Sequence, residues 1–273
     1  ARFAPGCFLH YGQGKWYPCE SLPRWTFALY WRRDGKPVWR NDALVAREGY
    51  LAPTDVAGAQ TFTADLAGRL GLGSDYVLPA YEDPVHWIAK EAELPVNVDP
   101  LDSKLADEEE RARIARVFDR GIGTAVGFVL PIQRWQSRAG AGWMSEKWRL
   151  RRGRLFLVPG DSPLGLRLPL GGLPWLPPHA VPHVVADDPF AARGELPDPD
   201  EVMRAYRHVG GGDTPRRSAP PPTADVDGAA VRTALAVELR EGKLCVFMPP
   251  LGTLEDYIEL LTAVEATAED LGL

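Results

Sequence analysis

The 273-residue chain lacks several features that would place a protein in a class at once. It has no apolar run near the ~20 residues that a bilayer-spanning helix needs, and no basic-then-apolar signal segment at its start. Its formal net charge of −6 argues against broad affinity for nucleic acid. From these absences we predict a protein that binds neither nucleic acid nor membranes.

Common catalytic and metal-binding signatures are also missing. Residues 12–15 (GQGK) have neither the spacing nor the Ser/Thr of a Walker phosphate loop, and there is no G-x-S-x-G nucleophile elbow. The five histidines are scattered, which argues against a zinc site. The cysteines, Cys7, Cys19 and Cys245, fit neither metal-ligand spacing nor a disulfide framework, so we predict free thiols in a cytoplasmic protein.

The chain does have enough apolar sequence to fold, because 45% of its residues are hydrophobic and 25% are charged. Its most distinctive segment is the opening stretch 9–18, which reads LHYGQGKWYP. Gly12 and Gly14 would let the backbone approach a ligand closely, because glycine has no Cβ. On residue types alone a tight turn leading into a hairpin is the simpler interpretation, so this segment indicates a pocket without indicating a reaction.

Patterns along the chain alternate between strands and helices without regular βαβ order. Helices are predicted at 55–70, from Pro84 to 93, from Asp107 to about 121 and from Thr253 onward. Strands are predicted at 24–32, 126–132, 232–239 and 243–248, with hairpins turning at Asp34-Gly35 toward residues 37–39, at Arg152-Gly153 within 147–158, and at Glu241-Gly242. These elements predict an α+β fold, a largely antiparallel mixed β-sheet with helices packed on one side.

One composition shift divides the chain. Residues 210–229 are rich in glycine and proline with few apolar anchors, which is typical of a flexible connector. We therefore expect an N-terminal α+β region at 1–209 and a hairpin-plus-helix region at 230–273. The chain begins with Ala1 rather than Met, which suggests a piece excised from a longer polypeptide.

Acidic residues at two places in the sequence are candidate ligands. Glu82 and Asp83 lie between a strand and a helix, where carboxylates could bind a hard cation such as Mg²⁺, or could simply cap the helix that opens at Pro84. Glu238, on the strand TALAVEL, shares a face with Ala234 and Ala236, and these small neighbours leave room for a ligand. A solvated face near the strand end is the other interpretation of Glu238.

The densest positive patch lies at 147–154. Lys147, Arg149 and Arg151 are expected on one strand face, with Arg152 and Arg154 following. The phosphate group of a nucleotide is the functional interpretation, and an exposed, charged sheet edge that resists aggregation is the structural one.

Several long motifs together resemble a known family. They are HYGQGKWYP, PRWTFALYWRRDG, PAYEDP, LPVNVDPLDSKL, RLFLVPGDSPLGLRLPL and the pair VRTALAVEL–KLCVFMPPL. The chain is similar, over nearly its whole length, to the amidoligase domain that follows a transglutaminase-like domain in long bacterial proteins. That family is distantly similar to carboxylate–amine ligases of the glutamine-synthetase type, which implies a fold that is glutamine-synthetase-like in part.

The resemblance implies ATP- and Mg²⁺-dependent amide formation on a peptide or protein substrate. It implies Glu20, Glu82 and Glu238 as metal ligands, with Glu20 and Glu238 catalytic. It implies Gly12, Gly14, Lys15 and Arg154 as nucleotide contacts, and a transglutaminase-like domain of the same polypeptide as a partner. Because the family continues into a glycine-rich GTGGGNH-like segment that this sequence lacks, we expect residues 1–273 alone not to turn over.

The alternative hypothesis is a non-catalytic module that presents peptide to the transglutaminase-like domain. Its binding platform would be an aromatic cluster made of Trp16, Tyr17, Trp25, Tyr30 and Trp31. An acidic cluster that faces one cavity would favour the ligase, whereas outward-facing aromatics with scattered acids would favour the binding module.

Overall fold

The computed structural model describes most of the chain. The described residues are 6–13, 25–32, 34–93, 108–137, 140–150, 153–177, 190, 192, 194–196, 198, 200–202, 204 and 230–273. The predicted connector at 210–229 lies outside them, so the proposed division at that segment stays a prediction.

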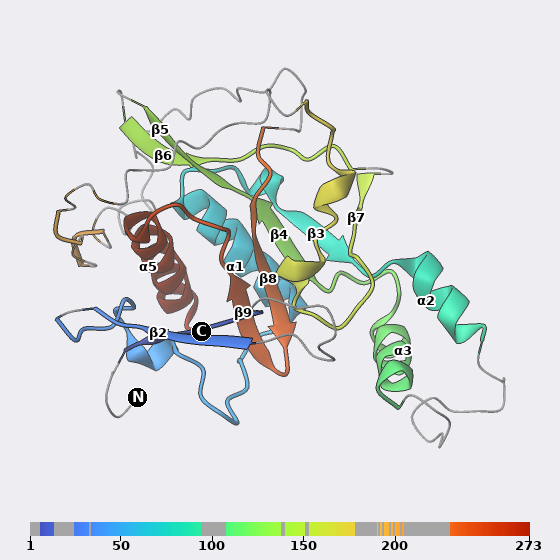
Figure 1. The fold of residues 1–273 in the computed structure, drawn as a ribbon. Helices are drawn as coiled ribbons and strands as arrows, with labels where there is room; N and C mark the ends of the chain where they lie inside the picture. The colour runs from blue at the N-terminus through green and yellow to red at the C-terminus, as the bar shows by residue number, and fades with distance from the viewer. Residues whose placement is uncertain are drawn as a thin grey trace, which may run out of the picture.

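A five-stranded mixed sheet forms the centre of the molecule (Figure 1). Its strands, in spatial order, are β7 (Leu155–Phe156), β3 (Leu78–Tyr81), β4 (Gly127–Pro131), β8 (Ala234–Arg240) and β9 (Lys243–Phe247). The pairs β3–β4, β4–β8 and β8–β9 are antiparallel, and β3–β7 is parallel. The predicted fold class, α+β with a largely antiparallel sheet, is confirmed.

The β8–β9 hairpin forms where the sequence predicts it. Glu241 and Gly242 have φ angles of 52° and 72°, the left-handed conformation that a two-residue hairpin turn requires at both central positions. The register places Cys245 opposite Glu238 and Val237 opposite Val246. This hairpin therefore fixes which side chains of β8 share a face with those of β9.

Two long helices cover one face of the sheet. Helix α1 (Val56–Arg69) begins at the N-cap Asp55, whose carboxylate accepts the amide N–H of Gly58, and α5 (Leu254–Leu271) begins at the N-cap Thr253. Both helices were predicted from the apolar residues that lie on one side of each. Their main cluster of buried residues joins Ala59, Phe62, Leu66, Ala67, Leu70, Phe128, Leu130, Ile132, Trp143, Leu235, Val237, Leu260 and Ala263.

The opposite face is covered by coil and short 3₁₀ turns. These turns are η4 (Leu164–Arg167) and η5 (Leu170–Gly172). The core on this side joins Ala80, Val126, Val129, Trp148, Leu155, Leu157, Leu164, Leu173 and Ala236. Glu238 follows Ala236 by two positions, so it points to this face as predicted.

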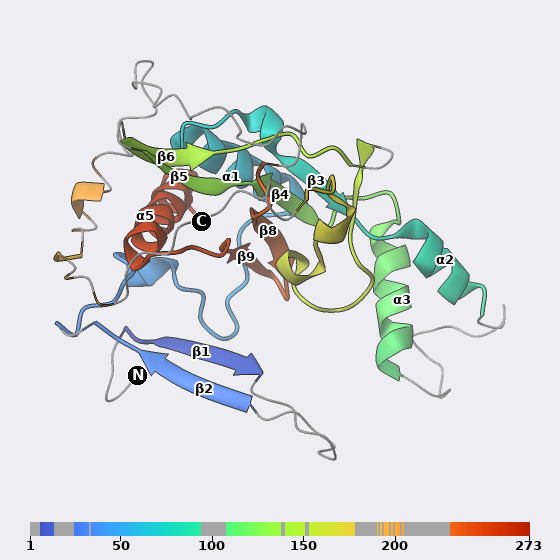
Figure 2. The same ribbon diagram turned by 45° about the horizontal axis from the view of Figure 1, so that its top comes forward.

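Helices α2 (Pro84–Glu91) and α3 (Glu108–Arg120) project beside the sheet and pack on each other (Figure 2). Their small apolar cluster consists of Trp87, Ile114 and Val117. Pro84 occupies the first turn of α2, as the sequence predicts, because its missing N–H would have no intrahelical partner there.

Two predicted hairpins are wrong. Strand β2 (Trp25–Tyr30) pairs with β1 (Phe8–Gln13) rather than with residues 37–39, so Gly12 lies in a strand, opposite Thr26. Segment 147–150 forms no strand, and β7 pairs with β3 instead. The alternation in 147–150 has another cause, because Trp148 is buried with its Nε1 donating to the Val231 carbonyl at 2.7 Å, while Lys147 pairs with Asp75 at the surface.

The remaining elements complete the outline of the fold. A separate two-stranded ribbon pairs β5 (Gln133–Ser137) with β6 (Gly140–Met144). Two single-turn 3₁₀ helices occur at η1 (Asp42–Leu44) and η2 (Ser74–Tyr76).

We predict that Gly127→Ala weakens the contact between β4 and β8. An added Cβ would lie 2.5 Å from the Val237 carbonyl oxygen and 2.7 Å from Leu164 Cδ1, so backbone must move. The expected loss in free energy of unfolding is about 1–3 kcal/mol, measured by urea denaturation. Gly123→Ala is the control, because its Cβ would meet nothing within 4 Å. Equal losses in the two variants would contradict this account.

Candidate functional site

The first candidate residue, Glu238, lies near the C-terminal end of strand β8. Its side chain is 8% exposed, and Oε1 accepts the backbone N–H of Leu164 at 3.0 Å. Burial raises the pKa of Glu238, whereas the Leu164 N–H and the charges of Arg240, Arg167 and Arg120 act in the opposite direction. Glu238 is thus a buried carboxylate near three cationic side chains from three different elements.

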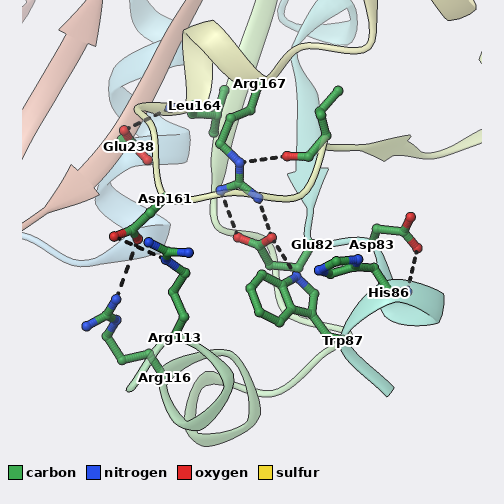
Figure 3. A network of polar contacts seen from close by, with 11 residues as sticks. Glu82, Asp83, His86, Trp87, Arg113, Arg116, Asp161, Leu164, Arg167 and Glu238 are labelled. Atoms are coloured by element: carbon green, nitrogen blue, oxygen red, sulfur yellow. Dashed lines mark hydrogen bonds and ion pairs between the residues drawn. The ribbon is translucent and has the colours of Figure 1, made fainter. Parts of the chain in front are cut away.

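Glu82, directly after β3, is buried in a different way. Arg167 donates to both of its oxygens, with Nη1–Oε1 at 3.0 Å and Nη2 on Oε2. The indole Nε1 of Trp87 donates to Oε2 at 3.0 Å. Figure 3 shows this arrangement, in which the two terminal nitrogens of the guanidinium face the two carboxylate oxygens. Such a bidentate pair fixes both side chains in one geometry.

The segment 161–167 joins the two carboxylates. It contacts Glu238 through the Leu164 amide and Glu82 through Arg167 (Figure 3). At its start, Asp161 forms ion pairs with Arg113 and Arg116 of α3 at 3.4 and 3.5 Å, and its carbonyl accepts from Arg240 at 2.9 Å. The segment therefore links the sheet, η4 and α3 at one place.

The positive charge that lies against Glu82 is the guanidinium of Arg167. Arg167 neutralises Glu82 directly, and its charge also lowers the pKa of Glu238. All three of its donor nitrogens are used, since Nε donates to the Val158 carbonyl at 2.8 Å. A metal ion at Glu82 would have to displace Arg167 and Trp87.

The described carboxylates do not form a divalent-cation site by themselves. Across the parts of the chain that the structure describes, no three His, Cys, Asp or Glu side chains come together to hold a metal ion. Mg²⁺ needs several oxygen ligands around one point, and Glu82 has both oxygens engaged. The donors present at Glu82 and Glu238 therefore do not fit the metal that the family resemblance implies.

The other predicted site residues are dispersed. Arg154 lies over the ring of Tyr81, 5.3 Å from its centroid, and so is beside the end of β3 that carries Glu82. Gly12 lies in β1, in the separate hairpin. Glu20, Gly14 and Lys15 lie outside the described residues.

Sequence reasoning missed the arginines whose charges act on Glu238. Arg167 stands in the apolar run LGLRLPL, where a single charge among leucines is the signal that could have marked it as a buried partner. Arg120 and Arg240, at the ends of α3 and β8, carry no comparable signal. Cys245, opposite Glu238, is a free thiol whose pKa is raised by burial and by the charge of Glu238. Cys7 is also free, as predicted.

An aromatic surface lies away from this cluster. Tyr30 and Trp31, at the end of β2, are 59% and 63% exposed. They line a cavity of about 740 Å³ whose other wall includes Thr253 and Tyr257 at the start of α5. Trp16, Tyr17 and the side chain of Trp25 fall outside the described residues, so only part of the predicted aromatic platform can be placed.

Comparisons with known proteins give one positive result. A family model described as "Putative amidoligase enzyme (DUF2126)" matches residues 1–273. No curated protein and no solved structure matches the chain. Among the described residues, no helix has both the length and the apolar character to cross a membrane.

We predict that Glu82→Gln strongly destabilises the fold, because it leaves the buried Arg167 without a compensating charge. The expected loss is about 3–5 kcal/mol in free energy of unfolding, measured by urea denaturation. The control is Asp34→Asn, which breaks the Arg32–Asp34 pair at the surface and should leave the unfolding midpoint unchanged. A Glu82→Gln protein as stable as the control would show that the buried pair is not required.

We also predict a pH-dependent effect of Glu238→Gln on stability. Since the pKa of Glu238 is raised above 4.5 in the folded protein, the folded state holds this proton more tightly than the unfolded chain. The resulting contribution to stability is fully present below pH 4.5 and is lost as the pH rises through the folded-state pKa. Glutamine does not titrate, and its amide oxygen can still accept the Leu164 N–H.

The measurement is urea unfolding of the natural chain and of Glu238→Gln at a series of pH values from acidic to neutral. The stability of the variant relative to the natural chain should increase with pH. The contribution of Glu265, whose pKa is also raised by burial, cancels because it is present in both proteins. A difference that stays constant with pH would be incompatible with a raised pKa at Glu238.

Proposed function

We propose, because the chain belongs to the DUF2126 amidoligase family, that it forms an amide bond between a carboxylate and an amine with cleavage of ATP. The substrate carboxylate would be that of a peptide or protein. Family membership over all 273 residues supports the reaction class.

The reaction makes two demands on a protein. The carboxylate attacks the terminal phosphorus of ATP, which releases ADP and leaves an acyl phosphate. The amine then attacks the acyl carbon, inorganic phosphate leaves, and the attacking nitrogen loses a proton. The site must therefore offer a base for that proton and positive charge near the phosphoryl oxygens.

Glu238 and its surroundings are suited to both demands, and this is the observation that carries the proposal. A carboxylate whose pKa is raised by burial is a stronger base than an ordinary glutamate, so Glu238 would accept the proton of the amine. Arg120, Arg167 and Arg240 act electrostatically on Glu238, and Arg120 and Arg240 would supply charge for the phosphoryl group. Arg167 is committed to Glu82, so it would position η4 and the Leu164 amide.

The remaining assignments belong to the proposal as well. Arg154 beside Tyr81, and Gly12, Gly14 and Lys15, would contact the nucleotide, with Glu20 as a further acidic group. Mg²⁺ would enter with the ATP phosphates, which is its usual mode of binding, since Glu82 and Glu238 do not form a cage for it. In this proposal the chain has a transglutaminase-like domain of the same polypeptide as its partner and is located in the cytoplasm.

The test uses the full-length natural polypeptide that carries residues 1–273, supplied with ATP, a peptide pool and either a primary amine or hydroxylamine. Acyl phosphates react with hydroxylamine to give hydroxamates, which are detected together with ADP. Glu238→Gln should slow amide formation about 10²-fold or more. The reaction with hydroxylamine should be slowed less, because hydroxylamine is mostly unprotonated at neutral pH and needs a base less.

Glu241→Gln, which removes a carboxylate from the exposed turn of the same hairpin, is the matched control and should retain full activity. Absence of any ATP-dependent hydroxamate or amide from the natural protein would overturn the proposed reaction. Equal slowing of both nucleophiles by Glu238→Gln would overturn the role of Glu238 as the base.

A second candidate function, a peptide-binding module, is favoured by the exposed Tyr30 and Trp31 at the cavity of about 740 Å³. Exposed aromatic side chains beside a groove are typical of peptide-binding surfaces. In that case Trp31→Ala would weaken binding of peptides, and no variant of Glu238 would change it.

A further inference from the structure

A smaller cavity, of about 230 Å³, lies on the other face of the sheet from Glu238. Leu244 and Val246 of β9 line it, and these residues alternate with Cys245, the cross-strand neighbour of Glu238. Its other walls come from α1, α5 and segment 39–52. Nothing in the amide-forming reaction proposed above uses this cavity.

One charged group lies among its mostly apolar lining. Glu265 of α5 is 5% exposed, and its Oε1 accepts the backbone N–H groups of Arg40 and Asn41 at 2.9 and 3.0 Å. Its second oxygen, Oε2, is buried and has no hydrogen-bond partner. A buried carboxylate oxygen without a donor is energetically unfavourable, so this position favours a ligand that brings a donor.

The local charges indicate the sign of that ligand. The guanidinium of Arg40 pairs with Glu269, and the side-chain amide of Asn41 also donates to Glu269, at 2.9 Å. The hydrogen bonds that Glu265 accepts come from neutral backbone N–H groups, and burial raises the pKa of its carboxyl, so a cation beside Oε2 would favour the ionised form. A single positive charge that carries N–H donors would complete the site.

We propose that this cavity binds a primary alkylammonium group, with Glu265 Oε2 accepting from the ammonium. The alkyl chain would lie against Phe62, Val246 and Val264. The volume of about 230 Å³ is below that of typical drug-sized pockets and fits a chain of a few carbons. A free alkylamine and a lysine side chain present this same group. The inference is independent of the proposed ligase reaction.

The experiment is calorimetric titration of the folded 273-residue chain with n-butylammonium, and with butan-1-ol as the uncharged analogue. Butylammonium should bind in the millimolar range, and butan-1-ol about tenfold or more weakly. Glu265→Gln should weaken butylammonium binding by about tenfold or more while keeping the two backbone contacts. Asp270→Asn removes a negative charge from the exposed end of the same helix and should bind like the natural chain.

Ala268→Leu fills the cavity without changing its charge and should abolish binding. This second variant keeps the proposal testable even if Glu265→Gln does not fold. A parallel titration with the methylamide of Nα-acetyl-lysine separates the two sources, because a site for protein lysine binds it at least as tightly as butylammonium. The proposal is overturned if butylammonium does not bind the folded natural chain, if butan-1-ol binds equally well, or if binding survives Glu265→Gln or Ala268→Leu.

Discussion

The buried ion pair between Glu82 and Arg167 is the interaction on which the candidate site depends. The two residues are 85 positions apart in sequence, and their contact ties the end of β3 to η4. Both side chains are buried, so without its partner each would be an uncompensated charge away from water, which is strongly destabilising. The same pair fixes the position of the Leu164 amide, which is the hydrogen-bond donor to Glu238. A structural salt bridge thus determines the surroundings of the group that we propose to be catalytic.

Three consecutive residues at the end of β3 have separate structural roles. The ring of Tyr81 lies under Arg154 and its carbonyl accepts the Leu157 amide, Glu82 binds Arg167, and Asp83 caps α2. An acidic pair before a helix can cap the helix or bind a ligand, and here the two roles are divided: Asp83 caps the helix, and Glu82 binds a guanidinium. This arrangement leaves Glu238 as the carboxylate of this cluster best suited to proton transfer, since burial raises its pKa while no arginine is bound to both of its oxygens.

Local signals in the sequence predicted what local physics controls. The apolar stripes of α1 and α5, the proline of α2 and the Glu241-Gly242 turn are local patterns, and all of them were identified. The face of Glu238 followed from strand alternation alone. The partner of Arg167 could not be predicted, because it lies in a different element. The alternation at 147–150 suggested a strand, although it is the buried side chain of Trp148 that holds this segment in place. The pairing of β2 with β1 was not predicted either, because the residue pattern of one strand does not show which of two nearby segments it pairs with.

Hydrogen exchange at the Leu164 amide tests most directly whether the buried pair supports the site. In the natural chain this amide donates to Glu238 and should be strongly protected. In folded Glu82→Gln, the account predicts that protection at Leu164 falls sharply, because η4 loses its anchor, while the Val237 amide in the centre of β8 keeps its protection relative to the global stability of the variant. Unchanged protection of Leu164 in the variant would contradict the claim that the Glu82–Arg167 pair positions the loop against Glu238.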